Sequence, residues 1–240
     1  MSRREYLDAL GLTDWVARTG TVLSDPTPAA VVPAAVSPTD AAPRAAVAVP
    51  DRAPVDTWAL LQHEVSRCTR CRLHETRTQT VFGVGNPGAR LMVIGEAPGA
   101  EEDRRGEPFV GRAGQLLNAM LVAIGLTREA IFIANAIKCR PPQNRDPRAD
   151  ETASCRGYLE AQIEAIQPEV VMAVGRVAAQ LLLDSELTLG KLRGREHELP
   201  GHGMPLVVTY HPAYLLRSPA QKRLAGVDLK RVRNLLGQTT

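Results

Sequence analysis

The sequence predicts an α/β fold, a three-layer α/β/α sandwich around a short, mainly parallel four-stranded sheet. Four short runs are apolar on both faces, as parallel strands covered by helices must be. These runs are residues 91–94, 131–134, 170–174 and 206–209. Stretches with helical character follow them in alternation, and this alternation favours a sheet with helices on both sides. The expected helices cover about 111–124, 151–166, 176–183 and 219–236.

The first 54 residues differ in composition from the rest of the chain. Apolar residues in 1–18 are spaced for one face of a short helix. Seven prolines follow between residues 26 and 54, and proline interrupts both helices and strands. We therefore predict a short N-terminal helix plus an Ala/Pro-rich disordered linker in 1–54, and one folded domain in 55–240. The helix is interpreted either as a docking peptide for a protein partner or as a frayed tail.

The composition favours a cytoplasmic protein with no membrane partner. The charged N-terminal segment lacks the apolar core of a signal peptide, and no apolar run approaches the roughly 20 residues that span a bilayer. Beyond residue 54 the chain has 24 basic and 20 acidic residues, and this excess of positive charge suits a nucleic-acid partner without requiring one. We expect the chain to be a monomer.

Four cysteines suggest a metal centre. Cys68 and Cys71 form a C-x2-C pair, and Cys139 and Cys155 form a second, wider pair. Disulfides are not expected in a cytoplasmic protein. The alternative to a metal centre is four unrelated buried thiols. Zinc and an iron–sulfur cluster both take four thiolates, so the spacing leaves both open.

The residues that follow each predicted strand are the candidates for a site, because α/β sheets bind ligands beyond the carboxyl ends of their strands. The segment 95–99, GEAPG, is followed by several acidic residues, which would repel a phosphate, and no Walker motif is present. Asn135 follows the second strand, where a turn-forming role is the simpler interpretation. The loop 209–217 contains His211 together with aromatic and leucine side chains, an unusual composition for a structural turn.

These motifs resemble those of the family 4 uracil-DNA glycosylases. The resemblance rests on GEAPG at 95–99, PFVG at 108–111, Asn135, CRPP at 139–142 and HPAYLL at 211–216, in that order. It covers about residues 56–236 and excludes the first 54. The resemblance implies a hydrolase for DNA base-excision repair, which flips uracil out of nucleoid DNA, cleaves its N-glycosidic bond and leaves an abasic site. It also implies that the four cysteines hold a [4Fe–4S] cluster rather than zinc.

The resemblance also assigns site residues. A pocket of Gly95, Glu96, Ala97, Phe109, Asn135 and His211 would bind the flipped base. The Asn135 amide fits uracil in one orientation and mismatches cytosine, while Phe109 would stack on the ring. His211 would donate to the uracil anion as the bond breaks. Ala97 stands where related enzymes carry an aspartate, which leaves Glu96 and Glu102 as candidates for positioning the water.

A second group of residues is predicted to contact DNA. A flipped base leaves a gap in the stack, and apolar wedges hold such gaps open in other proteins. Tyr214, Leu215 and Leu216 follow His211 closely and would form the wedge, and Arg217 would hold a flanking phosphate. The alternative is that the two leucines pack inward at the start of the last helix.

Two other functions remain open at this point. One is a non-catalytic binder of uracil-containing DNA, and the other is a replication accessory that docks through the N-terminal helix. Asn135 and His211 are both present, which favours the enzyme. A related branch of the superfamily forms a covalent adduct with DNA through a histidine in the segment after the second strand. Here that segment, residues 138–150, contains no histidine, so an enzyme that turns over is expected.

Overall fold

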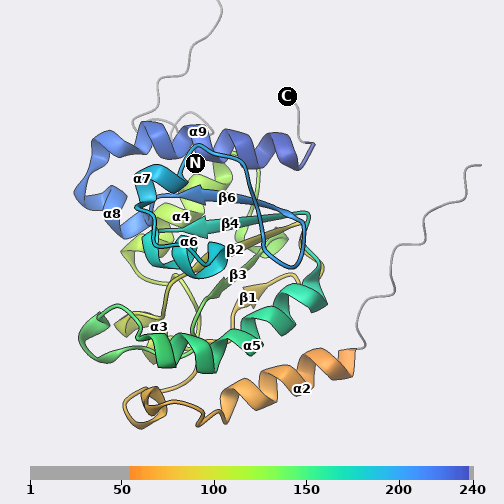
Figure 1. Ribbon diagram of the computed structural model, residues 1–240, viewed down its shortest axis with the longest axis vertical. Helices are drawn as coiled ribbons and strands as arrows, with labels where there is room; N and C mark the ends of the chain where they lie inside the picture. The colour runs from red at the N-terminus through yellow and green to blue at the C-terminus, as the bar shows by residue number, and fades with distance from the viewer. Residues whose placement is uncertain (1–54, 238–240) are drawn as a thin grey trace, which may run out of the picture. The chain divides into compact units, whose positions relative to one another are not determined.

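Four parallel strands form the centre of the sheet in the computed structural model, which describes residues 55–237 (Figure 1). Within this range the strand order is β1-β3-β2-β4-β6-β5. The parallel strands are β2 (Leu91–Gly95), β3 (Phe132–Asn135), β4 (Val170–Val174) and β6 (Pro205–Thr209). Each lies within one residue of its predicted run. The α/β class and the mainly parallel sheet are therefore confirmed.

The predicted count of four strands was too low, because two antiparallel edge strands complete the described sheet. The first, β1 (Val84–Gly85), pairs with β3, and the second, β5 (His197–Glu198), pairs with β6. Each is only two residues long, too short to show the alternation by which a strand is recognised in a sequence. One strand separates β1 from the central strand β2, and one separates β5 from β4.

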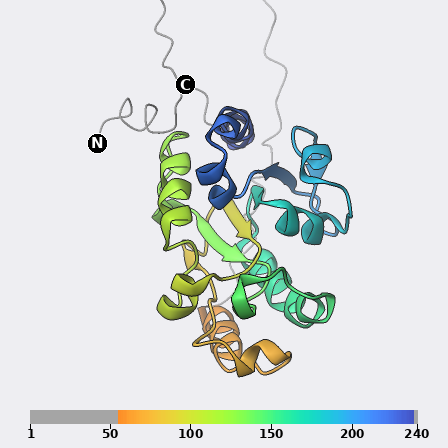
Figure 2. The same cartoon turned by 90° about the vertical axis from the view of Figure 1, so that its left-hand side faces the viewer.

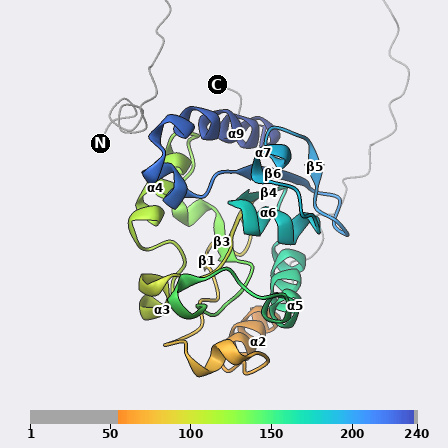
Figure 3. The same ribbon diagram turned by 60° about the vertical axis from the view of Figure 1, so that its left-hand side comes forward.

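Helices cover both faces of the sheet, so the three-layer sandwich is confirmed. One face packs against α2 (Val55–Ser66), α5 (Ala149–Ile166), α6 (Arg176–Leu183) and α7 (Leu189–Leu192). The other packs against α4 (Arg112–Val122), α8 (Pro212–Arg217) and α9 (Lys222–Leu235). In Figure 2 the strands run between α4, in yellow-green, and α6, in teal. Figure 3 shows α2 alongside α5, which it contacts.

The central strands alternate between the two apolar cores. Met92 and Ile94 of β2 belong to the core under α5 and α6, whereas Leu91 and Val93 belong to the core under α4 and α9. All five residues of β2 are buried. This double burial explains why the strands appear in the sequence as continuous apolar runs.

The helices agree with the predicted ranges except near the carboxyl end. The predicted helix 176–183 matches α6, and α4 and α5 begin and end within two residues of their predictions. The predicted helix 219–236 is divided into the short η4 (Pro219–Gln221) and α9, and α8 precedes both. The remaining short helices are α3 (Ala100–Arg105), η1 (Arg72–Glu75), η2 (Arg128–Ala130) and η3 (Pro142–Asn144).

No helix within residues 55–237 is long and apolar enough to cross a membrane. The N-terminal helix and linker predicted for 1–54 lie outside the described residues.

Candidate active site

A pocket of about 430 Å³ opens at the carboxyl ends of the parallel strands, where α/β sheets bind their ligands. The ends of β2, β3 and β6 supply Glu96, Asn135 and His211. Among the other predicted residues, Ala97, Glu102, Phe109 and Arg217 also line this pocket. Side chains that lie more than a hundred positions apart in the sequence are thus brought together at one edge of the sheet.

Gly95 lets the Asn135 side chain and the Phe109 ring approach the backbone of β2. A Cβ atom at position 95 would lie 2.4 Å from Asn135 Oδ1 and 2.7 Å from Phe109 Cζ, so any side chain there would displace both. Asn135 is buried at the end of β3, directly beside Gly95 in the parallel register. The role of Gly95 is therefore to leave room for two other pocket residues.

Phe109 is held in a backbone conformation that is rare for an aromatic residue. Its φ of 55° lies in the left-handed region, which is unfavourable for residues with a Cβ. Arg128 donates hydrogen bonds to the carbonyl oxygens of Pro108 and Phe109. A Cβ at Gly114 would lie 1.7 Å from the Phe109 oxygen, so α4 can approach this turn only through a glycine. The surroundings thus fix the ring at the pocket.

Glu102 holds the same loop from the other side. Its Oε1 accepts hydrogen bonds from the backbone N–H groups of Val110, at 3.0 Å, and Gly111, at 3.3 Å. One carboxylate oxygen is therefore engaged in shaping the Phe109 turn. This contact favours a supporting role for Glu102.

Glu96 is a partly buried carboxyl group just past the end of β2. Burial, assisted by the negative charge of Asp146 and opposed by Arg176, raises the pKa of Glu96 to about 7. A carboxyl group with such a pKa exchanges a proton near neutral pH, as a general base does. Perturbed groups of this kind cluster at functional sites.

His211 is positioned as a neutral imidazole. Its Nδ1 accepts a hydrogen bond from the backbone N–H of Ala213 at 3.2 Å and thereby caps α8. Burial and the nearby Arg217 lower the pKa of His211 to about 4, with Glu102 acting in the opposite direction. Because Nδ1 is an acceptor, the single ring proton resides on Nε2, which makes that atom a donor. The ring centroid lies 5.7 Å from that of Phe109.

A buried ion pair fixes the end of β6, two residues before His211. Asp228 accepts hydrogen bonds from Thr209 Oγ1, at 2.7 Å, and from two nitrogens of Arg193, at 2.7 and 2.8 Å. The Arg193 guanidinium also lies 4.5 Å from the Tyr210 ring centroid. Sequence reasoning did not find this network, because its members are far apart in the chain.

The residues of the predicted wedge differ in their exposure to solvent. Leu215 is 1% exposed and belongs to the core under α4 and α9, whereas Tyr214 is 39% and Leu216 is 37% exposed. The Tyr214 ring stacks on Tyr210 with centroids 5.3 Å apart. Leu215 therefore takes the inward position of the alternative interpretation, and its buried side chain does not fit the prediction that it contacts DNA.

The sequence analysis missed the loop that closes the pocket after β3. Pro141, Asn144 and Arg145 line the pocket. Both Arg145 Nη atoms bind the buried Glu151 carboxylate, at 2.8 and 2.5 Å. Gln143 and Asn144 have φ values of 58° and 54°, which turn the loop back over the sheet. The only signal in the sequence was the arginine-rich segment that follows CRPP.

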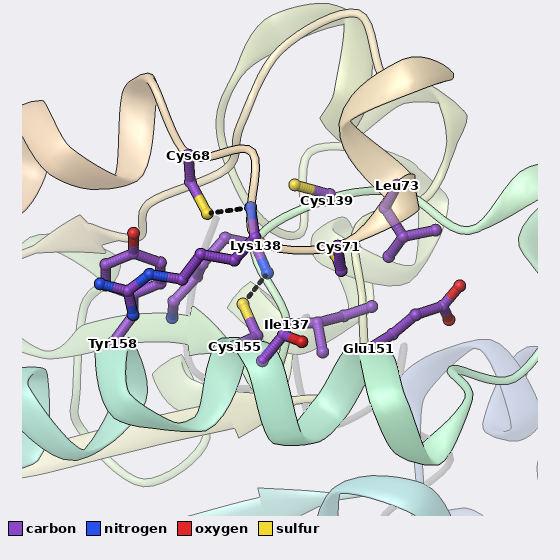
Figure 4. Close-up of a pocket in the computed structure, with 11 residues that line it drawn as sticks. Cys68, Cys71, Leu73, Ile137, Lys138, Cys139, Glu151, Cys155 and Tyr158 are labelled. Atoms are coloured by element: carbon purple, nitrogen blue, oxygen red, sulfur yellow. Dashed lines mark hydrogen bonds between the residues drawn. The ribbon is translucent and has the colours of Figure 1, made fainter.

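The four cysteines line a second pocket, between η1, the loop after β3 and α5 (Figure 4). Cys139 and Cys155 are buried, and Cys68 and Cys71 are partly buried. In residues 55–237 no group of three or more His, Cys, Asp or Glu side chains is arranged to hold a metal ion as it stands. The thiols nevertheless share one pocket, as the sequence analysis predicted for a set of ligands.

The surroundings of these sulfurs suit thiolate ligands. Burial raises the pKa of the Cys139 thiol to about 11 and also raises that of Cys155, so their thiolates need nearby positive charge or donors. Arg77 Nη1 donates to Cys139 Sγ at 3.0 Å, and the Lys138 backbone N–H donates to Cys155 Sγ at 3.3 Å. The Arg70 backbone N–H lies 3.5 Å from Cys68 Sγ. Three of the four sulfurs thus have a donor, so the residues present fit a four-thiolate cluster.

The fold and this site define a three-layer α/β protein with a pocket at the carboxyl ends of its parallel strands and a separate group of four cysteines. The sequence model of the uracil DNA glycosylase superfamily matches residues 82–230. A type-4 uracil-DNA glycosylase of Archaeoglobus fulgidus is 44% identical over 181 residues, which are 73% of this chain and 91% of the relative. The corresponding enzyme of Thermotoga maritima is 41% identical over 180 residues, covering 74% and 93%. The chain belongs to the type-4 family of the uracil-DNA glycosylases.

More distant relatives are also similar. A type-5 uracil-DNA glycosylase of Thermus thermophilus is 33% identical over 152 residues, which are 55% of this chain and 68% of the relative. The similarity thus extends beyond the type-4 enzymes within the superfamily.

Proposed function

We propose that this protein excises uracil from DNA in base-excision repair. It flips the uracil nucleotide into the pocket, hydrolyses the N-glycosidic bond and leaves an abasic site. The observation that carries this proposal is one pocket that joins a buried amide, an aromatic ring and a neutral imidazole. The test is alkali cleavage of a labelled oligonucleotide that contains one uracil. Binding of this oligonucleotide without cleavage would instead favour the non-catalytic binder.

Asn135 reads the base in this proposal. Uracil presents an acceptor at O4 and a donor at N3, and cytosine presents the reverse, so a fixed amide matches only uracil. Phe109, held rigidly by its turn, supports the ring without discriminating between pyrimidines. The close packing of Asn135 Oδ1 against Gly95 limits how the amide can lie.

Asn135→Asp is expected to lower uracil excision about 10- to 100-fold, the value of a matched pair of hydrogen bonds to a base. An ionised carboxylate cannot donate to O4, so the correct base loses its advantage. Excision is measured on duplexes with a U:G and with a C:G pair. Uracil excision at the wild-type rate would remove Asn135 from the recognition role.

His211 stabilises the leaving base. Cleavage leaves a sugar cation and a uracil anion, whose charge gathers partly on O2. A donor aimed at developing charge gives electrostatic catalysis its largest contribution, and the Nε2 proton of neutral His211 is such a donor. Because the pKa of His211 is about 4, this neutral form persists throughout the physiological pH range.

Glu96 is proposed to position the attacking water, with Glu102 supporting the Phe109 loop. The raised pKa of Glu96 gives a direct expectation. The ionised form accepts a proton from water, so kcat/KM should fall about tenfold per pH unit as the pH drops below about 7. The Glu96→Gln variant should excise uracil more slowly, and its kcat/KM should not fall in this way as the pH drops. The measurement is single-turnover excision at subsaturating enzyme, which reports kcat/KM, between about pH 5 and 8, and a flat wild-type profile would exclude Glu96 as the base.

The exposed side chains of α8 are proposed to contact the DNA. Leu216→Ala should slow excision from duplex DNA about tenfold, while excision from single strands changes little, because only a duplex has a stack to fill. The matched control is the adjacent Leu215→Ala, which should destabilise the fold by about 2–5 kcal/mol and affect both substrates alike. Equal losses on both substrates for Leu216→Ala would contradict the wedge. Arg217 is proposed to hold a flanking phosphate.

The four cysteines are proposed to hold a [4Fe–4S] cluster. Such a cluster would supply a structural cross-link between α2, the loop after β3 and α5, since hydrolysis of a glycosidic bond requires no electrons. With DNA as its substrate, the protein is proposed to act in the cytoplasm on the nucleoid. The monomeric state and a partner for the N-terminal helix stay predictions.

A further inference from the structure

Lys138 is a buried lysine that the reaction described above does not use. It is 1% exposed and is among the largest fully buried side chains in residues 55–237. A buried amine is costly unless its hydrogen bonds are satisfied. Its Nζ donates to the backbone carbonyl oxygen of Asn135 at 2.8 Å and to Gln162 Oε1 at 2.6 Å. The lysine side chain thus ends at the residue proposed to read uracil.

Gln162 fixes the position of this amine. Its side chain is fully buried on α5, and its Nε2 donates to the Phe82 carbonyl oxygen at 2.9 Å. The amide is therefore engaged at both ends, with its donor on Phe82 and its acceptor facing Lys138. A chain of three hydrogen bonds runs from Phe82 through Gln162 and Lys138 to the end of β3.

This chain acts on Asn135 at the backbone. The Ala136 N–H donates to the Gly95 carbonyl oxygen at 2.8 Å, which holds one side of the peptide group that follows Asn135. Lys138 holds the carbonyl oxygen of that same group. Both contacts restrict the peptide group next to the Asn135 Cα atom, which carries the side chain. A recognition amide discriminates between uracil and cytosine only while its orientation is maintained.

The other end of Lys138 lies at the cysteine pocket. Its backbone N–H donates to Cys155 Sγ at 3.3 Å (Figure 4), and its carbonyl oxygen accepts from the Val81 N–H at 2.7 Å. Cys139 is the next residue in the chain. One residue therefore contacts the proposed cluster ligands through its backbone and the proposed recognition residue through its side chain.

We propose that Lys138, held by Gln162, is a positioning residue that fixes Asn135 and thereby sets the discrimination between uracil and cytosine. This inference rests on the proposed role of Asn135. It adds a specificity determinant that lies outside the substrate pocket, since Lys138 does not line that pocket.

The test compares Lys138→Met, which removes the amine at similar volume, with Gln162→Met, which keeps the amine and removes its acceptor. Binding is measured on duplexes carrying 2′-fluoro-2′-deoxyuridine or 2′-fluoro-2′-deoxycytidine, because the fluorine disfavours the sugar cation and suppresses cleavage. Both variants are expected to lower the uracil-over-cytosine preference about tenfold, the effect of one lost hydrogen bond. Iron content and visible absorption are recorded for each protein.

A double-mutant cycle separates positioning from general destabilisation. In an Asn135→Ala background, Lys138→Met should cause no further loss of preference, because the residue through which it acts is gone. Ile163→Ala, in the core beside Gln162, is the control: it should melt early and keep the wild-type preference. If Lys138→Met does not fold, Gln162→Met in both backgrounds completes the same cycle.

Either of two results would overturn the inference. The first is an unchanged uracil-over-cytosine preference in a folded Lys138 or Gln162 variant. The second is an equal decrease of that preference, as a ratio, with and without Asn135. Failure of the proposed function is distinguishable, because the wild-type protein would then neither excise uracil nor prefer the uracil analogue. A wild-type protein that excises uracil, together with Lys138 variants that retain full preference, rejects this inference alone.

Discussion

His211→Asn is expected to lower kcat for uracil excision about 100- to 1000-fold, the usual cost of removing a donor from developing negative charge. Asparagine preserves the second function of the residue, because its side-chain oxygen can cap α8 by accepting from the Ala213 N–H. The shorter amide does not reach the position of the imidazole Nε2. The loss should therefore appear in the chemical step, with the fold maintained.

The measurement is single-turnover excision under saturating enzyme, together with thermal melting. The matched control is His63→Asn, the same substitution on the exposed side of α2, which should excise uracil at the wild-type rate. A folded His211→Asn protein that retains full turnover would exclude His211 as the catalytic donor. Early melting of this variant would show that asparagine does not preserve the cap of α8, and His211→Gln would then be the next variant.

Replacing Cys155 or Cys68 with Ala is expected to remove the cluster and destabilise the protein together. A site that forms only in the folded state contributes its binding free energy to folding. With about 2–4 °C per kcal/mol for a domain of this size, the loss of such a centre should lower Tm by more than about 10 °C. Cys155 is the sharper test, because its sulfur is buried and accepts the Lys138 N–H.

The readouts are iron content, the visible absorption of the purified protein and thermal melting. Ser154→Ala is the control on the same helix, because Ser154 lines the cysteine pocket without offering a thiolate. This variant should keep its iron and melt within a few degrees of the wild type. Cysteine variants that retain the full iron content would show that these thiols are not ligands, and zinc in place of iron would overturn the choice of cluster.

The central strands and the large helices were predictable from the sequence because their burial repeats along the chain. Two-sided burial produces continuous apolar runs, and amphipathic helices reveal their period over ten or more residues. The helix α8 has six residues and begins at Pro212, so it shows less than two turns of periodicity. Its inward residue, Leu215, and its outward residue, Leu216, were therefore not distinguished.

The residues of the candidate site were predicted mainly through motifs. The residues that hold them in place were not predicted. Asn135 and His211 were assigned through the family resemblance, and the structure places both at the carboxyl ends of strands that meet at one edge of the sheet. Arg128 and Gln162 act through backbone carbonyls of distant residues, and such contacts have no local signature. The loop with Asn144 was missed for a further reason: its left-handed turn uses residues other than glycine.

The burial of Glu96 also affects the stability of the fold. Its pKa rises from 4.5 to about 7 on folding, so the native protein retains a proton that the unfolded chain releases earlier. Stability from this group is complete below pH 4.5 and declines as the pH rises through about 7. The ionised form, which is proposed to activate water, is therefore the one that the fold tolerates least. If Glu96 has its proposed role, reactivity at this carboxyl group is maintained at the expense of stability, and a more stable native state is expected from substitutions of Glu96 that abolish turnover.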